Sequence, residues 1–197
     1  MAVTVQDRSL MTESLKEWDI EDLLALKQGQ LMQLYLTLPC PTMQEMGGEF
    51  KGHLLDTGKF WIIKKPLAFF ALNFINGKWL GKGFTNTSDA EGHGYNSSER
   101  LGRVIHKLPM KTCIAKSIYD GKDVFELDYT VYHSQAGFVN MIDEVRKVNG
   151  QLYLGIGNWG YFKKQRAVPF FFGLSGPREP YAGIDKQHRD RRRRFPK

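Results

Sequence analysis

The first regular pattern along the chain is helical. Apolar side chains recur every three or four residues between Asp19, a residue type that caps helix starts, and Pro39, which ends helices. This spacing predicts one helix over residues 19–38, preceded by a flexible polar arm over residues 1–18. Its apolar face is formed by Ile20, Leu23, Leu24, Leu31, Leu34, Tyr35 and Leu38.

From Gly77 onward the pattern changes to β-strands. Asp120-Gly121 and Asn149-Gly150 each separate two runs rich in apolar and β-branched residues, and such pairs supply the positive φ of tight hairpin turns. After the first turn, apolar residues alternate with polar ones and should face inward. These inward residues are Phe125, Leu127, Tyr129 and Val131.

The strand count favours a barrel. Strands are expected near 78–84, 101–107, 112–119, 123–133, 137–148, 151–157 and 167–173, and His93 and Tyr95 fall in a glycine-rich loop between them. Short turns without helical crossovers indicate antiparallel pairing. We therefore expect an α+β, mainly β, single domain over residues 19–185, with a barrel over about 45–175 and the helix packed on it. A β-sandwich is the alternative.

Two glycine motifs resemble each other. Gly-x-aromatic-x-Gly occurs at Gly48–Gly52 and again at Gly77–Gly81 within "NGKWLGKGF". The second copy lacks the spacing, the hydroxyl residue and the following helix of a phosphate-binding loop. Its glycines are expected to give Trp79 room where a strand bends, and Lys78 and Lys82 to face solvent.

These motifs carry a resemblance to a known family. The first motif, then Trp79–Phe84 about 30 residues later, then Ile118-Tyr119-Asp120 and Asp128, resemble the GXWXG/DUF4334 proteins over roughly residues 42–160, with Phe50 in place of the family's tryptophan. The resemblance implies a lipocalin-like barrel of the calycin or fatty-acid-binding-protein type, with no well-established activity.

Charge is concentrated at the C-terminus. Residues 186–197 hold seven basic residues and one acidic residue, so they carry +6 of the formal +7 and leave +1 for the rest. We expect a disordered basic tail that could contact nucleic acid or an anionic surface. The residues concerned are Arg191, Arg192, Arg193 and Arg194.

Other site classes have little support in the sequence. Two cysteines make no disulfide framework, and the N-terminus has no apolar signal segment, so a cytoplasmic protein is expected. The five histidines lack metal-ligand spacing, and neither a metal nor a cofactor is expected.

The candidate ligand-binding residues come from the predicted barrel. Its aromatic side chains could line an apolar cavity, and a buried lysine or arginine could hold the polar end of a ligand. The candidates are Trp79, Phe84, Tyr119, Tyr129, Tyr153 and Trp159, with Lys116 or Arg146 as the polar anchor.

Three functions remain open from the sequence. The first is binding of a small hydrophobic molecule, as a carrier or sensor. The second is an isomerase, cyclase or hydrolase that uses Asp128, Asp143 or Glu144, and because Asp143 and Glu144 are adjacent, one of them must face inward on a strand. The third is a nucleic-acid-associated protein that acts through the tail. A barrel cavity of roughly 300 Å³ or more would favour the first two, whereas a solid interior would indicate a scaffold.

Overall fold

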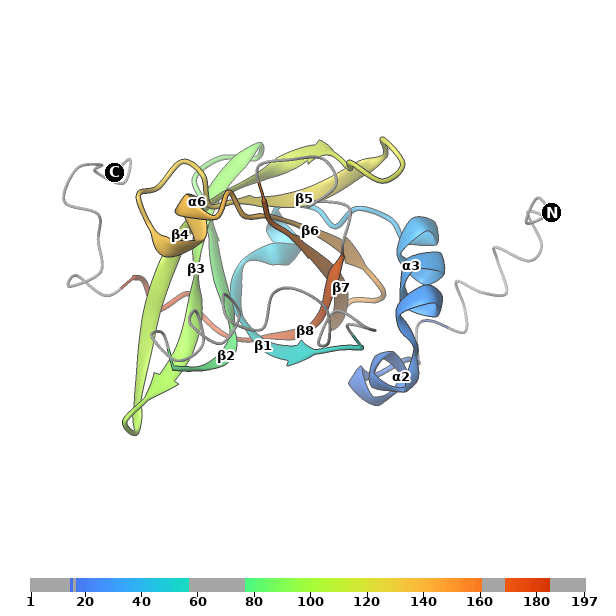
Figure 1. Cartoon of the computed structure of the whole chain (residues 1–197), viewed down its shortest axis with the longest axis horizontal. Helices are drawn as coiled ribbons and strands as arrows, with labels where there is room; N and C mark the ends of the chain where they lie inside the picture. Colours follow the sequence, from blue (N-terminus) through green and yellow to red (C-terminus); the bar gives the residue numbers. More distant parts are fainter. Residues whose placement is uncertain (1–14, 16, 57–76, 161–168, 185–197) are drawn as a thin grey trace.

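The protein is a closed antiparallel barrel of eight strands with a few helices, so the mainly β, lipocalin-like prediction is confirmed (Figure 1). A computed structural model describes residues 15, 17–56, 77–160 and 169–184. The strands are β1 (Gly48–Leu54), β2 (Lys78–Asn86), β3 (Glu91–Arg100), β4 (Arg103–Lys116), β5 (Asp123–Asp128), β6 (Ile142–Lys147), β7 (Leu152–Asn158) and β8 (Phe170–Glu179).

Each strand pairs with its neighbour in sequence, and β8 closes the barrel against β1. In the closing ladder, Glu49 lies opposite Glu179 and Leu54 opposite Phe172. The two glycine motifs lie on adjacent strands, since Phe50 of β1 pairs with Lys82 of β2.

The prediction of a single helix over residues 19–38 is wrong. The structure has two helices there, α2 (Ile20–Ala25) and α3 (Gln28–Thr37), and Leu26 and Lys27 between them are extended. The spacing of apolar residues does not reveal this break, because the buried leucines of both helices belong to the same hydrophobic cluster. Gly29, a poor helix former, follows the break in the first turn of α3.

Several strand bounds also differ from the sequence prediction. The segment with His93 and Tyr95 is strand β3 rather than a loop, and one long strand, β4, replaces the two expected near 101–107 and 112–119. The stretch 137–148 begins in helix α6 (Gln135–Phe138) before β6 starts. Hydrophobic alternation failed at β3 because glycine, serine and asparagine occupy half of its ten positions.

Apolar side chains pack in two layers, one inside the barrel and one outside it. Phe125 and Leu127 point into the interior, as predicted, together with Tyr153 of β7. Leu154 and Ile156 of β7 point outward and pack under α3. Because helices cover its outer face, every residue of β7 is buried. Figure 1 shows α2 and α3 along this side of the barrel.

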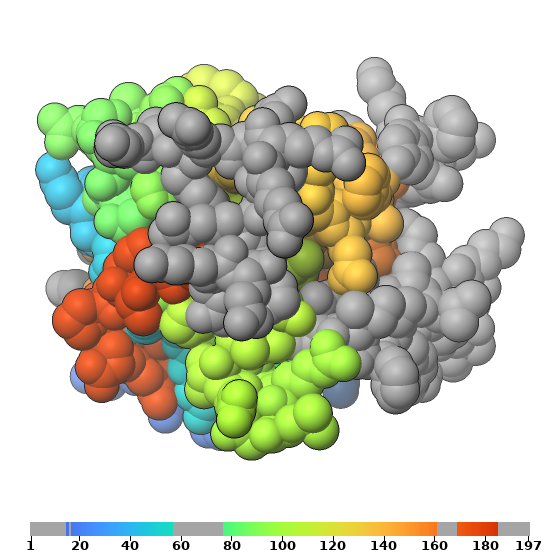
Figure 2. Space-filling view, turned by 90° about the vertical axis from the view of Figure 1, so that its left-hand side faces the viewer, coloured from blue at the N-terminus to red at the C-terminus, as the bar shows by residue number. Residues whose placement is uncertain are grey.

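The two ends of the barrel differ. The short helix η1 (Gln44–Met46) lies at one end, where Met43 and Met46 join the interior cluster that contains Phe50 and Phe84. The other end is the one at which β2, β6 and β8 begin, and it carries α6. Figure 2 views the molecule from the side on which the β3–β4 hairpin and the α6 segment reach the surface. None of the helices in the described ranges is long and apolar enough to cross a membrane.

Candidate ligand-binding site

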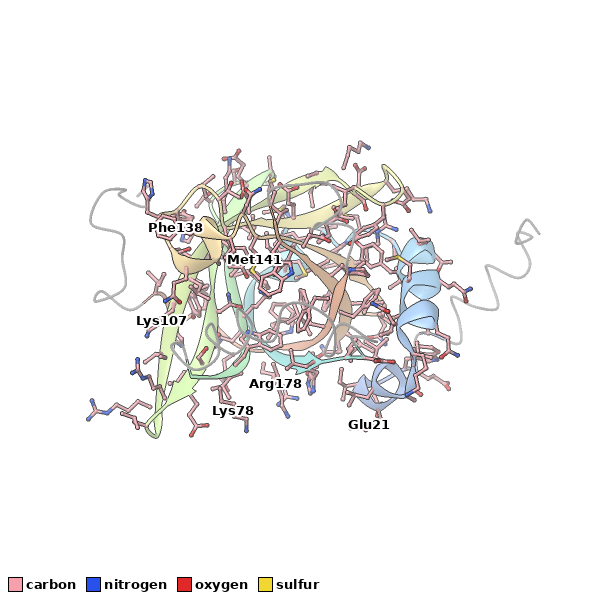
Figure 3. All side chains as sticks on the ribbon, viewed as in Figure 1. Glu21, Lys78, Lys107, Phe138, Met141 and Arg178 are labelled. Atoms are coloured by element: carbon pink, nitrogen blue, oxygen red, sulfur yellow. The ribbon has the colours of Figure 1, made fainter. Side chains whose placement is uncertain are left out.

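A cavity of about 120 Å³ lies in the barrel at the end where β2, β6 and β8 begin. Its walls are mostly aromatic and aliphatic side chains, with a few polar ones on β2, β3 and β6. Met141, which follows α6, also lines it and lies closer to the middle of the barrel than the exposed Phe138 in Figure 3. The interior is therefore neither solid nor as large as the roughly 300 Å³ of a typical drug-sized pocket.

Lys82 is the centre of a buried polar cluster at the cavity wall. Its Nζ donates hydrogen bonds to Asp143 Oδ2 and Asn96 Oδ1, both at 3.0 Å, and to the Tyr129 hydroxyl at 2.5 Å. An ammonium group has three N–H donors, and here three acceptors surround it. This match indicates a charged Lys82 paired with an ionised Asp143.

The remaining polar atoms of the cluster pair with one another. Trp79 Nε1 donates to Asn96 Oδ1 at 3.0 Å, and Asn96 Nδ2 donates to the Tyr129 hydroxyl at 3.0 Å. Since an indole nitrogen can only donate, it fixes which end of the Asn96 amide is the oxygen. The Tyr129 hydroxyl in turn lies 3.3 Å from Asp143 Oδ2, to which it donates.

One atom of the cluster lacks a partner among the described residues. Asp143 Oδ1 is buried and accepts no hydrogen bond from them. It lies next to Gly157, which also lines the cavity. An acceptor in this position can receive a hydrogen bond from a molecule in the cavity.

Burial shifts the proton affinities of these groups. Loss of hydration lowers the pKa of the Lys82 ammonium, and the charge of Asp143 opposes that shift. Burial likewise raises the pKa of Asp143, against the effect of Lys82. Burial and the Asp143 charge raise the pKa of Tyr129 well above its ordinary value, so Tyr129 stays neutral.

A β-bulge brings Trp79 and Lys82 to the same side of β2. Residues three apart on a regular strand face opposite sides, but the β2–β3 register shifts between Trp79 and Gly81. Gly81 has a φ of 155°, and a Cβ there would lie 1.9 Å from the Phe50 carbonyl oxygen. Glycine therefore allows the bulge, and the expectation that Lys82 faces solvent is wrong, whereas Lys78 is exposed.

The glycine of the first motif provides the room for Trp79. A Cβ on Gly52 would lie 2.4 Å from the Trp79 ring, so the indole rests directly on the backbone of β1. The ring then meets Phe172 edge-on, with centroids 6.0 Å apart. The sequence prediction assigned this role to the glycines of the second motif, but Gly52 of the first motif makes the room for Trp79, and Gly81 instead allows the bulge.

Three of the six predicted aromatic residues line the cavity, namely Trp79, Tyr129 and Trp159. Phe84 and Tyr153 lie deeper in the interior, where each packs against Phe50 and neither lines the cavity. Tyr119 lies outside the barrel, with its ring against Tyr35 of α3 and its hydroxyl on Asn158.

Neither predicted polar anchor reaches the cavity. Lys116 is exposed and pairs with Asp123 at 2.7 Å. Arg146 is fully buried, but under α3 on the outer side of β6, where it binds both carboxylate oxygens of Asp120 and the Tyr35 carbonyl. Strand parity explains this, because Arg146 has the opposite orientation to the inward Asp143.

The three acidic candidates also differ in whether they face the cavity. Asp143 faces the cavity. Glu144 faces outward but is buried, and it accepts hydrogen bonds from the Tyr35 hydroxyl, the Ser117 hydroxyl and the Ile118 backbone. Asp128 ends β5 and accepts from Thr130, away from the cavity.

Lys82 and Asn96 are cavity residues that the sequence reasoning missed. For Lys82, the signal was the glycine inside a strand, which often marks a bulge. For Asn96, no comparable signal exists. Its strand is rich in glycine and polar residues and therefore has the composition of a loop. Within the described part of the chain, no cluster of three His, Cys, Asp or Glu side chains could hold a metal ion.

Comparison with known proteins supports the fold and gives no information on function. No protein-family model matches the chain, and no curated protein is similar to it in sequence. The crystal structure of a protein from Thermomonospora curvata matches it with a TM-score of 0.52 and 18% identity, over 86% of this chain and 95% of the other. A structural match at this identity shows a shared fold and nothing more. The likeness to GXWXG/DUF4334 proteins stays a prediction.

Proposed function

We propose that the protein binds a small molecule with an apolar body inside the barrel, as a carrier or sensor. The observation that carries this proposal is the cavity itself, which joins apolar walls to one buried polar cluster. Binding sites for small molecules have this composition, in which apolar surface gives affinity and a few polar groups fix orientation.

The size of the cavity limits the ligand. A protein cavity of about 150 Å³ is large enough for benzene, and this cavity measures about 120 Å³. The part of the ligand held by the described residues is therefore no larger than a small ring or a short branched chain. Long-chain fatty acids exceed this space.

The test is saturable binding of two apolar probes: xenon, which is smaller than the cavity, and toluene, whose ring is at the upper limit of its size. NMR would follow the indole N–H signal of Trp79, assigned with Trp79→Phe. We expect saturation in the intact protein and its loss in Ala136→Leu, which adds bulk to the cavity wall. Ala25→Leu, on the exposed face of α2, is the matched control and should bind normally. Absence of binding by both probes would contradict the proposal.

A second function, an enzyme that moves protons on a small apolar substrate, is favoured by Asp143. Its Oδ1 is buried, unpaired among the described residues and next to the cavity, which is the position a general base requires. Deuterium exchange at the α-carbon of cyclopentanone in D₂O would distinguish the two functions. An enzyme would accelerate exchange in a manner lost in Asp143→Asn, whereas a carrier would bind the ketone without exchange.

A further inference from the structure

We propose that the ligand presents a hydrogen-bond donor, a hydroxyl or an N–H group, to Asp143 Oδ1. The site would then select small alcohols, phenols or amines over hydrocarbons and over carboxylates. This inference rests on the proposed binding function and specifies the chemistry of the ligand's polar end.

The hydrogen-bond donors of Lys82, Tyr129 and Trp79 are paired within the cluster. All three N–H groups of Lys82 have acceptors, and the Tyr129 hydroxyl proton points to Asp143 Oδ2. The Trp79 indole N–H is taken by Asn96. These three side chains therefore have their donors committed to internal partners and have little left to offer an acceptor on a ligand.

One acceptor of the cluster, Asp143 Oδ1, lacks a donor among the described residues. Asp143 is 3% exposed, its Oδ2 receives two donors, and its Oδ1 receives none from the described residues. A buried polar atom without a hydrogen bond is costly, and more so on a charged group. A donor on the ligand would remove that cost, so it would bind more tightly than an apolar group of the same shape.

The positive charge of Lys82 is already balanced by Asp143. The carboxylate of Asp143 already has Lys82 as its counter-ion, and no other lysine or arginine among the described residues lines the cavity. A carboxylate on the ligand would therefore place a second negative charge beside Asp143 without a free cation to balance it. Burial makes this repulsion stronger than it would be in water.

Three probes of similar size separate these predictions: phenol carries a donor, toluene carries none and benzoate carries an anion. Titration of the intact protein, followed by the Trp79 indole signal, should rank phenol about tenfold to a hundredfold tighter than toluene, the range for a hydrogen bond to a charged group. Benzoate should bind more weakly than toluene.

The outcomes distinguish this inference from the function on which it rests. If phenol and toluene bind equally, or if benzoate binds best, the donor inference is wrong while ligand binding stands. If none of the three binds while xenon does, the donor inference is wrong and binding of a small apolar molecule stands; if xenon fails as well, both are wrong. The comparison needs no variant, so it stays decisive even if changes at Asp143 impair folding.

A variant adds a second readout. Asp143→Asn keeps the shape of the side chain but removes its charge, and the preference for phenol over toluene should shrink by about tenfold. Asp128→Asn is the matched control, since Asp128 lies opposite Ile142 at the end of the neighbouring strand and outside the cavity. An unchanged preference in Asp143→Asn would overturn the assignment to Oδ1.

Discussion

Lys82 and Asp143 form an ion pair inside the barrel, with Nζ 3.0 Å from Oδ2 and each side chain 4% exposed. Such a pair is costly to break from one side, because the remaining charge stays buried without a partner. Lys82→Met should therefore lower the free energy of unfolding by about 3–5 kcal/mol, as measured by urea denaturation.

The double variant Lys82→Met/Asp143→Leu tests the reason for that loss. Replacing both charges by apolar groups of similar volume is often neutral, so much of the lost stability should return. Lys116→Met breaks the exposed pair with Asp123 and should change stability by less than about 1 kcal/mol. A double variant as unstable as the single one would show that the pair is not the cause.

Gly52 and Trp79 offer a second test, because the ring occupies the space that a Cβ would need. Gly52→Ala should force the indole away from Asn96 and cost about 1–3 kcal/mol, a typical penalty for overpacking. NMR would show a shift of the Trp79 indole N–H signal, and denaturation would give the loss of stability.

Gly29→Ala is the matched control for that change. Gly29 lies in α3 with no atom near the position of a new Cβ, so alanine should stabilise the protein by about 0.5–1 kcal/mol. The Trp79 signal should stay where it is. An unshifted Trp79 signal in Gly52→Ala would mean that the ring does not depend on this glycine.

The fold was more predictable from the sequence than the site, and Lys82 shows why. Strand periodicity and turn residues determine the antiparallel hairpins, because they depend on neighbouring residues only. The orientation of Lys82 depends instead on a register shift near Gly81, which arises when β2 pairs with β3. Gly81 is a local sign of a bulge, but only the pairing of β2 with β3 sets the side to which Lys82 points.

The outer face of the barrel was hard to predict for a related reason. Arg146 and Glu144 are polar residues on a strand, a pattern that usually indicates solvent. Here α3 covers that face, and Tyr35 supplies a hydroxyl to Glu144 and a carbonyl to Arg146. Burial by a distant segment is a tertiary effect, so only the pairing of helix and barrel reveals it.

The C-terminal tail lies outside the described residues, and its role stays a prediction from charge. If the chain contacts nucleic acid through Arg191–Arg194, deletion of residues 186–197 should abolish the affinity. In the intact chain, affinity should fall steeply with salt, because counter-ions are released from the phosphates. Fluorescence anisotropy with a labelled duplex would measure both, and binding that ignores salt would argue against the tail.

The turn of the β3–β4 hairpin holds a leucine in an unfavourable backbone conformation that a substitution can relieve. Leu101 and Gly102 form a two-residue turn with φ of 52° and 74°, and Leu101 is 94% exposed. Leucine is disfavoured at positive φ, whereas asparagine tolerates it and is common in such turns. Leu101→Asn should raise the free energy of unfolding by about 1 kcal/mol. Leu24→Asn, at an exposed helical site, should instead lower it slightly.

Protonation of Asp120 should lower the free energy of unfolding at acidic pH. Hydrogen bonds from the Arg146 guanidinium lower the pKa of Asp120 from 3.8 to about 2. Because the folded pKa is the lower one, the unfolded chain takes up the proton first as pH falls. The stabilisation, about 2 kcal/mol, is therefore complete above about pH 4 and lost as pH falls through 2.

Asp120→Asn should remove this contribution at neutral pH and flatten the loss of stability between about pH 4 and pH 2. Urea denaturation at several pH values would measure it. Asp123→Asn is the control, because Asp123 pairs with an exposed lysine and should leave the acid slope nearly unchanged. If both variants keep the slope of the intact protein, the Arg146–Asp120 pair does not set its acid stability.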